Sequence, residues 1–60
     1  MTALAKLRKR EKLRLRNVAE AIGVTPQTVW KHEKYGIKTL KIAQNYAVFF
    51  KCKPTDIIDL

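Results

Sequence analysis

The four residues Gly23-Val24-Thr25-Pro26 constrain the fold of this chain more than any other stretch. Gly23 can adopt the left-handed backbone conformation that ends many helices, and Thr25 can cap the next helix with its hydroxyl. Pro26 then suits a first helical turn, where its missing N–H costs nothing. Apolar residues recur at helical spacing before this stretch, at Leu15, Val18, Ala19 and Ile22. The pattern predicts a helix over residues 14–22 and a second helix from Pro26, joined by a tight turn.

The second of these helices is expected to pack with one side and to contact a partner with the other. Val29 and His32 share the inner side. The outer side holds four residues at i, i+3, i+4 and i+7 spacing: Gln27, Trp30, Lys31 and Lys34. A lone histidine on the inner side is expected to be a core or boundary imidazole with one hydrogen bond, and not a metal ligand or a pH switch.

Three more helices are expected around this pair. Thr2 can cap a first helix anchored by Leu4 and Leu7, and Thr39 can cap a fourth. The fourth helix carries apolar residues at spacings of 3 and 4, namely Leu40, Ala43, Tyr46, Ala47 and Phe50. A short fifth helix is predicted to begin at Pro54. The predicted fold is therefore all-α, a compact five-helix domain that spans residues 1–60 as a single unit.

Charge is the strongest compositional signal. The chain has 13 Lys and Arg against 5 Asp and Glu, which gives a net charge of +8, and its region from Lys6 to Arg16 holds seven of the basic residues. A protein this basic attracts polyanions at long range. The basic run has three interpretations: a solvated helix face, a set of contacts to a phosphate backbone, or a helix on a membrane surface. A narrow apolar stripe without aromatic residues disfavours the membrane surface.

Other classes of function find little support in the residues. The single Cys52 can form no internal disulfide and is expected to pack in the core, so a reducing, cytoplasmic compartment fits best. No set of a nucleophile with a base, and no Cys/His or acidic metal cluster, is apparent, so we expect no enzyme activity, no metal and no cofactor. No apolar run approaches the roughly 18 residues that a membrane span needs.

The register of these elements resembles a known family. Residues Leu13 to Glu33 look like the helix-turn-helix of the phage Cro and repressor family, also called the lambda-repressor-like or XRE family. Ahead of them, Leu4-x-x-Leu7-Arg8 is similar to the family's first helix. After them, the fourth and fifth helices are matched by Leu40-x-x-Ala43-x-x-Tyr46-Ala47-x-x-Phe50-x-Cys52-x-Pro54-x-x-Ile57-Ile58. The resemblance covers nearly the whole chain and implies a bacterial or phage transcriptional repressor that binds double-stranded DNA with its third helix in the major groove.

The family implies a role for individual positions. Arg8 and Glu33 match a pair that joins the first and third helices, so an ion pair is expected. The positions expected to read bases are Thr25, Pro26, Gln27, Thr28, Trp30 and Lys31. Of these, Thr25, Gln27, Thr28 and Lys31 match positions from which the family meets bases or phosphates. Chemistry agrees, because Gln can pair with adenine and Lys with guanine. The positions expected to hold phosphates with a cation or an N–H are Arg14, Arg16, Lys34, Tyr35, Gly36 and Lys38.

Some residues depart from the family's pattern. Arg14 and Leu15 stand where relatives often have Ser or Thr and then Gln, so the phosphate anchor is expected to move to a neighbouring Arg. Trp30 stands at a position that is small or polar in most relatives. Its indole is expected either to pack on a thymine methyl or sugar, or to fold back over the second helix.

One such helix reads only a few base pairs, so a homodimer on a two-fold symmetric operator is expected. The candidates for its seam are Ile57, Ile58 and Leu60, which alternatively close the small core. Two other functions fit the same sequence. The first is a protein-interaction adaptor or antitoxin-like regulatory subunit with an acidic partner, and the second is non-specific binding to the chromosome or to RNA.

Overall fold

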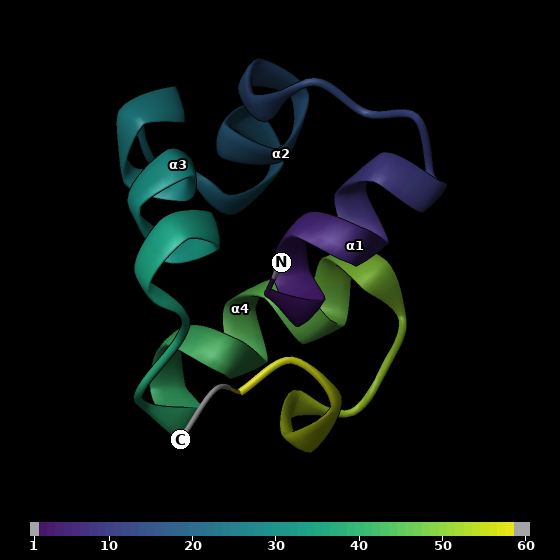
Figure 1. Cartoon of the computed structure of the whole chain (residues 1–60), viewed down its shortest axis with the longest axis vertical. Coiled ribbons are helices and arrows are strands. Elements are labelled where there is room, and N and C mark those ends of the chain that lie inside the picture. Colours follow the sequence, from purple (N-terminus) through teal and green to yellow (C-terminus); the bar gives the residue numbers. More distant parts are fainter. Residues whose placement is uncertain (1, 59–60) are drawn as a thin grey trace.

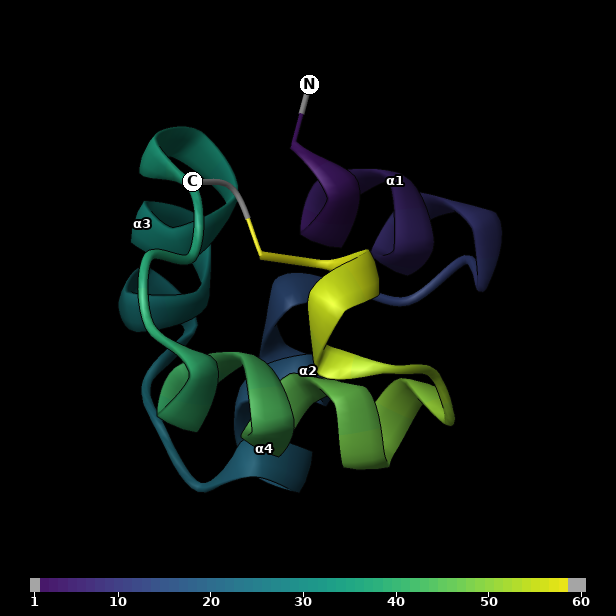
Figure 2. The same ribbon diagram turned by 90° about the horizontal axis from the view of Figure 1, so that it is seen from below.

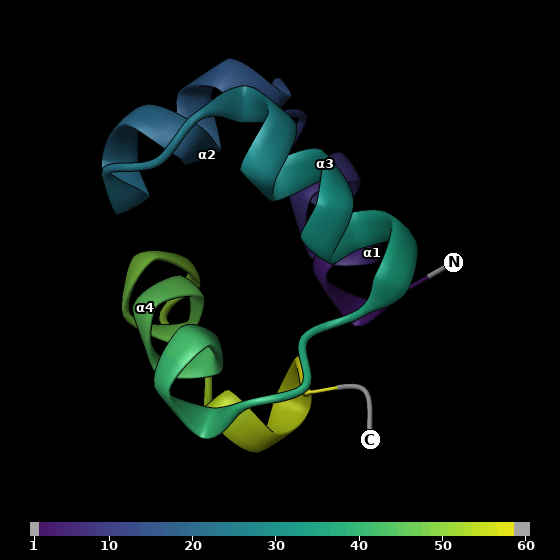
Figure 3. The same cartoon turned by 90° about the vertical axis from the view of Figure 1, so that its left-hand side faces the viewer.

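The computed structural model describes residues 2–58, which form four α-helices, one 3₁₀ turn and no strand. The elements are α1 (Ala3–Arg10), α2 (Leu15–Ile22), α3 (Pro26–Tyr35), α4 (Leu40–Phe50) and η1 (Pro54–Asp56). Figure 3 shows α2 and α3 along one side of the molecule and α4 with η1 along the other. The predicted all-α class is confirmed.

The predicted fifth helix is wrong, because only the 3₁₀ turn η1 forms there. Its backbone bonds run three residues back, from the Asp56 N–H to the Lys53 carbonyl at 2.9 Å and from the Ile57 N–H to the Pro54 carbonyl at 3.2 Å. Ile57 then leaves the helical conformation, with φ −124°. Its side chain is completely buried, so Ile57 packs into the core instead of extending the helix. The turn packs on α4 (Figure 2).

Local sequence signals set the bounds of the helices. The hydroxyls of Thr2, Thr25 and Thr39 accept the N–H three residues on, at 3.3, 3.2 and 3.4 Å respectively. These bonds satisfy N–H groups that a helix start leaves unpaired. Helix α2 begins one residue later than expected, because Arg14 is its extended N-cap and donates its N–H to the Asn17 side chain at 3.0 Å.

The turn between α2 and α3 follows the sequence residue by residue. Gly23 has φ 86° and ψ 33°, in the left-handed region. Its N–H and that of Val24 both donate to the Ala19 carbonyl, at 2.8 and 2.9 Å. Pro26 is the first residue of α3. The two helices therefore meet in a short corner that these two bonds close, and Figure 1 shows the corner between them.

The four helices, the connection between α3 and α4 and the residue after η1 contribute to one core. Its largest fully buried side chains are Tyr46, Leu4, Ile37, Ile57, Val18 and Val29. Burying each such side chain contributes roughly 1.5 to 3 kcal/mol. Ile37 comes from the connection between α3 and α4, where no apolar periodicity singled it out. Cys52 is partly buried and packs against this core, as expected.

The core decides between the two roles predicted for the C-terminal apolar residues. Ile57 is 0% exposed within the monomer, so of its two expected roles it closes the core and is not available for a dimer seam. Ile58 is partly buried and packs against the same core. Leu60, the third seam candidate, lies outside the described residues.

Candidate nucleic-acid interface

Helix α3 presents an outer face of polar and aromatic side chains. Gln27, Trp30, Lys31 and Lys34 are all exposed, while Val29 beneath them is completely buried. Thr25 and Pro26 are exposed at the start of the helix, and Thr28 is half-buried. The hydroxyls of Thr25 and Thr28 bond to one another at 3.0 Å, so both belong to the cap as well as to the surface. The outer and inner sides are divided as the spacing predicts.

An ion pair on the inner side attaches α3 to α1. Arg8 donates to both carboxylate oxygens of Glu33, from Nε to Oε2 at 2.5 Å and from Nη2 to Oε1 at 3.0 Å. The two side chains are only 16% and 9% exposed. The hydrogen bond to Glu33 raises the pKa of Arg8, although burial acts against it. The structure thus contains the pair that the resemblance implies.

Two further bonds strengthen this attachment. Arg8 Nη1 donates to the Leu13 carbonyl at 2.9 Å, which adds the connection between α1 and α2. The Thr2 hydroxyl donates to the Glu33 carbonyl at 2.7 Å. The N-cap and the last turn of α1 are therefore both bonded to the same residue of α3.

A histidine and a tyrosine attach α3 to α4. His32 Nδ1 and the Tyr46 hydroxyl are 2.7 Å apart, and the two rings meet edge to face with centroids 5.5 Å apart. Burial lowers the pKa of His32, and burial together with the charge of Glu33 raises the pKa of Tyr46 to about 12. The prediction of a boundary imidazole with one hydrogen bond is confirmed.

Trp30 lies beside α1, which is neither of the two positions expected for its indole in the absence of DNA: it does not fold back over α2. Its indole lines a hollow together with Ala5 and Lys9 of α1. The Lys34 ammonium is 4.9 Å from the centre of the Trp30 ring and 5.6 Å from that of Tyr35. Trp30 lies on this side because it is three residues, about one helical turn, before Glu33, so both side chains are on the face of α3 that meets α1.

The residues expected to hold phosphates fall into two groups. Arg14 and Arg16 are exposed at the start of α2, and Lys34, Tyr35 and Lys38 are exposed at and after the end of α3. Gly36 is not available: it is buried, and its N–H donates to the His32 carbonyl at 2.9 Å as the cap of α3. Its φ of 88° shows why glycine stands there.

Lys9 is the residue that the sequence did not single out. It is exposed and lines the same hollow as Trp30, although 21 positions separate the two in the chain. Within the basic run it is one cation among many. Only the packing of α1 against α3 distinguishes it from its neighbours.

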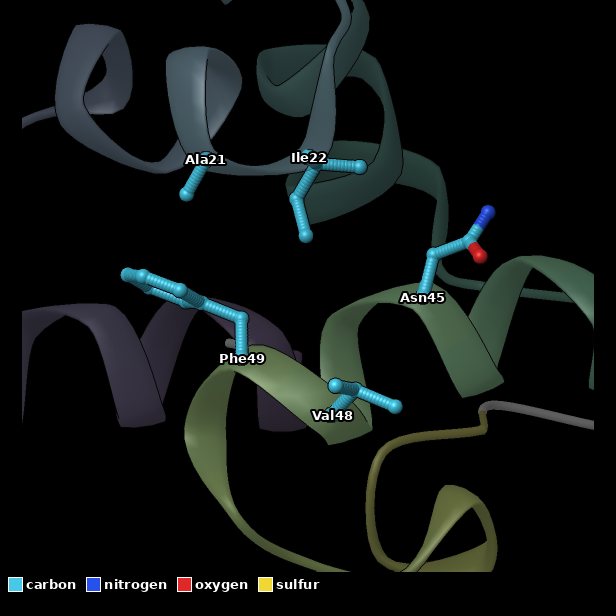
Figure 4. Close-up of a pocket in the computed structure, with 5 residues that line it drawn as sticks. All are labelled: Ala21, Ile22, Asn45, Val48 and Phe49. Carbon is cyan, nitrogen blue, oxygen red and sulfur yellow. The ribbon is translucent and has the colours of Figure 1, made fainter.

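A second hollow, of about 400 Å³, opens between α2 and α4. Figure 4 shows Ala21 and Ile22 of α2 facing Val48 and Phe49 of α4, with Asn45 at one side. Val48 is 79% exposed. None of these lining residues is titratable, and residues 2–58 contain no group of three His, Cys, Asp or Glu side chains that could hold a metal ion.

Comparisons with models of protein families, with curated proteins and with solved structures found no match for this chain. Within residues 2–58, none of the helices combines the length and the apolar character that crossing a bilayer would require.

Proposed function

We propose that this chain binds double-stranded DNA sequence-specifically, with α3 in the major groove, as a cytoplasmic transcriptional regulator of the Cro and repressor type. The observation that carries the proposal is the outer face of α3, where Gln27 and Lys31 are exposed on a helix whose inner side is fixed. The proposal includes no enzyme activity and no cofactor.

The attachments of α3 support this use of the helix. Arg8 holds it to α1, His32 holds it to α4, and the hydrogen-bonded corner at Gly23 joins it to α2. An α-helix with its side chains is about 10–12 Å across, and the major groove is about 12 Å wide, so α3 fits into the groove with its exposed side toward the bases. A helix held at three points presents its side chains without further ordering, which favours binding.

Base reading and backbone contact are assigned to different residues. Gln27 and Lys31, on the outer face of α3, are proposed to read base edges together with the Thr25–Thr28 cap. Arg14 and Arg16, at the start of α2, are proposed to hold phosphates. They would take over the phosphate contact that relatives make with a glutamine at the position of Leu15. Phosphate contacts supply affinity and orientation, while base contacts supply specificity.

The test is selection of bound sites from random duplex DNA. We expect one enriched motif, and a two-fold symmetric one if the protein acts as a homodimer. Gln27→Ala should weaken binding to that motif by about 1 to 3 kcal/mol and relax the preference at one base pair. Gln44→Ala, a change at an exposed glutamine of α4, should leave the preference intact. An unchanged preference in the Gln27 variant would refute its role.

A homodimer is proposed on DNA, because one recognition helix reads only a few base pairs. Analytical ultracentrifugation with and without the palindromic form of the selected motif distinguishes a free dimer from one that assembles on DNA. Two protein molecules per palindrome, spaced by about one helical turn, are expected. A single molecule bound to a full palindrome at saturation would contradict the dimer.

The hollow between α2 and α4 favours a second candidate, an adaptor or antitoxin-like subunit that binds another protein. Four of its five lining residues are apolar, and the exposed Val48 among them is a feature of protein contacts. The salt dependence of binding to random duplex distinguishes the two functions, since the logarithm of affinity falls by about 0.9 for each phosphate neutralised per tenfold rise in salt. A flat dependence would favour the adaptor.

Binding that a selected site cannot compete away would indicate non-specific chromosome or RNA binding instead.

A further inference from the structure

The hollow beside Trp30 is open to solvent and lies between two helices. Its volume is about 310 Å³, and its lining consists of Ala5 and Lys9 from α1 with Trp30, Glu33 and Lys34 from α3. It has room for roughly ten water molecules, which is more than a single bound ion would need. We refer to it as the Trp30 hollow.

The Trp30 hollow is electropositive. Lys9 and Lys34 bring one cation from each helix, and both residues are exposed. The only carboxylate in the lining, that of Glu33, is already paired through both of its oxygens with Arg8. Its charge is therefore compensated within the protein, and the two lysines determine which ligands the hollow attracts.

Trp30 gives the hollow an apolar wall with a polar edge. The side chain is 44% exposed, which is unusual for so large an aromatic residue in a small domain. Its ring offers apolar surface and its N–H is a hydrogen-bond donor. The Lys34 ammonium lies 4.9 Å from the ring centre, so a cation and an aromatic surface are presented side by side. Sugar and phosphate together match this pair of surfaces.

We propose that the Trp30 hollow receives the sugar-phosphate backbone along one wall of the major groove. Lys9 and Lys34 pair with its phosphates, and the Trp30 ring packs against a deoxyribose. This inference rests on the proposed function and deepens it, because it makes α1 part of the DNA interface and assigns Trp30 to the backbone instead of to a base.

The position of Trp30 on α3 is consistent with this role. Three residues along a helix correspond to a rotation of about 300°, so Trp30 lies about 60° away from Gln27 around the axis, on the side of α1. When Gln27 and Lys31 point at the floor of the groove, a side chain rotated by this amount points at a wall. The walls of the groove are the phosphate backbones.

A matched pair of charge variants tests the role of Lys9. Lys9→Gln should weaken binding to any duplex about fivefold to tenfold at 0.1 M salt and lower the salt slope by about 0.9. Arg10→Gln removes the same charge from the same helix and should change neither quantity. Arg10 lies near Cys52 instead. Burial and the charge of Asp56 raise the pKa of this thiol, and the charge of Arg10 acts against them. Equal effects of the two variants would overturn the proposal.

Trp30 provides a direct reading, because it is the chain's single tryptophan. Quenching of its fluorescence by acrylamide should fall at least severalfold when duplex DNA is bound. Trp30→Phe should keep most of the affinity. Trp30→Ala should weaken binding to every duplex without a change in the selected motif, since a deoxyribose carries no sequence information. Thermal unfolding of each variant confirms that it is folded.

The outcomes separate this inference from the function on which it rests. If no duplex is bound at any salt, the proposed function fails and the inference fails with it. If a selected duplex is bound tightly but Trp30 stays as open to acrylamide as in the free protein, the inference alone is refuted. A shift of the selected motif in Trp30→Ala would likewise overturn it, because it would show that Trp30 reads a base.

Discussion

Arg8 uses all three sides of its guanidinium within the protein. Two of its nitrogens bond to Glu33 and the third to the Leu13 carbonyl. A paired, largely buried ion pair contributes little compared with a well-packed apolar pair, but removing one partner leaves an uncompensated charge. The pair therefore matters chiefly for where it holds α3, and its loss affects both stability and the proposed interface.

At this scale we predict a strong coupling between the two residues. Glu33→Ala should destabilise the protein by about 2 to 4 kcal/mol, because Arg8 remains without its partner. A double-mutant cycle with Arg8→Ala, measured by urea unfolding, should give a coupling energy of about 1 to 3 kcal/mol. Glu20→Ala, at an exposed acid of α2, should stay within about 0.5 kcal/mol of the wild type. A coupling energy near zero would contradict the pair.

His32 gives a pH dependence with a definite sign. Burial lowers its pKa in the folded protein below the ordinary 6.5, so the unfolded chain binds more protons in that window. Stability should be complete above the unfolded pKa and fall as the pH drops through 6.5 toward the folded pKa. Urea unfolding between about pH 7.5 and about pH 5 should show the decline, and His32→Gln should flatten it. An equal decline in both proteins would assign it to other groups.

At the scale of the elements, α2 and α4 each end at a residue in the left-handed conformation, which is unstrained in one case and strained in the other. Gly23 after α2 has φ 86°, where glycine is unstrained, and Lys51 after α4 has φ 56°, where a side chain is strained. The two ends are built alike, with an N–H bonded to the carbonyl four residues back. Only the residue type differs, so substitutions at the two sites should act in opposite directions.

Gly23→Ala should cost about 1 kcal/mol of stability, all of it from the backbone, because no atom lies within 4 Å of an added Cβ. Gly23→Asn should cost less, since asparagine tolerates this conformation. Lys51→Gly should stabilise the protein by up to about 1 kcal/mol. Circular dichroism during thermal unfolding measures all three. Stabilisation by Gly23→Ala would show that the left-handed turn is not required.

For the whole molecule, the central fact is that one small core is completed by residues from all four helices, by Ile37 and by Ile57. A chain of 60 residues has a total stability of about 3 to 9 kcal/mol, so each fully buried side chain carries a large share of it. The burial of Ile57 means that the monomer has a closed core of its own. Dimer formation on DNA is therefore not needed to cover this residue.

Ile57→Ala should destabilise the protein by about 2 to 5 kcal/mol through the cavity it leaves, and Ile57→Val by about 0.5 to 1.5 kcal/mol. The unfolding midpoint of the milder variant should not depend on protein concentration, because the lost contacts are within one chain. Val48→Ala, at a side chain that is 79% exposed, should change little. A midpoint that rises with concentration only in the wild type would place Ile57 in an interface after all.

The sequence by itself determined the four helices, the threonine caps of α1, α3 and α4 and the corner at Gly23, because these depend on residues within four positions of one another. It also placed Gln27 and Lys31 on the outer side of α3 through helical spacing alone. The resemblance to a known family indicated the pairing of Arg8 with Glu33 across 25 positions.

Only the tertiary structure decided the remaining features. It turned Ile57 into the core and stopped the last helix after a single turn, used the Gly36 N–H as a cap, and set Trp30 beside Lys9 of α1. Each of these depends on contacts between residues far apart in the chain. Local spacing fixes which side of a helix a residue occupies, but the neighbour on that side is chosen by how the helices pack.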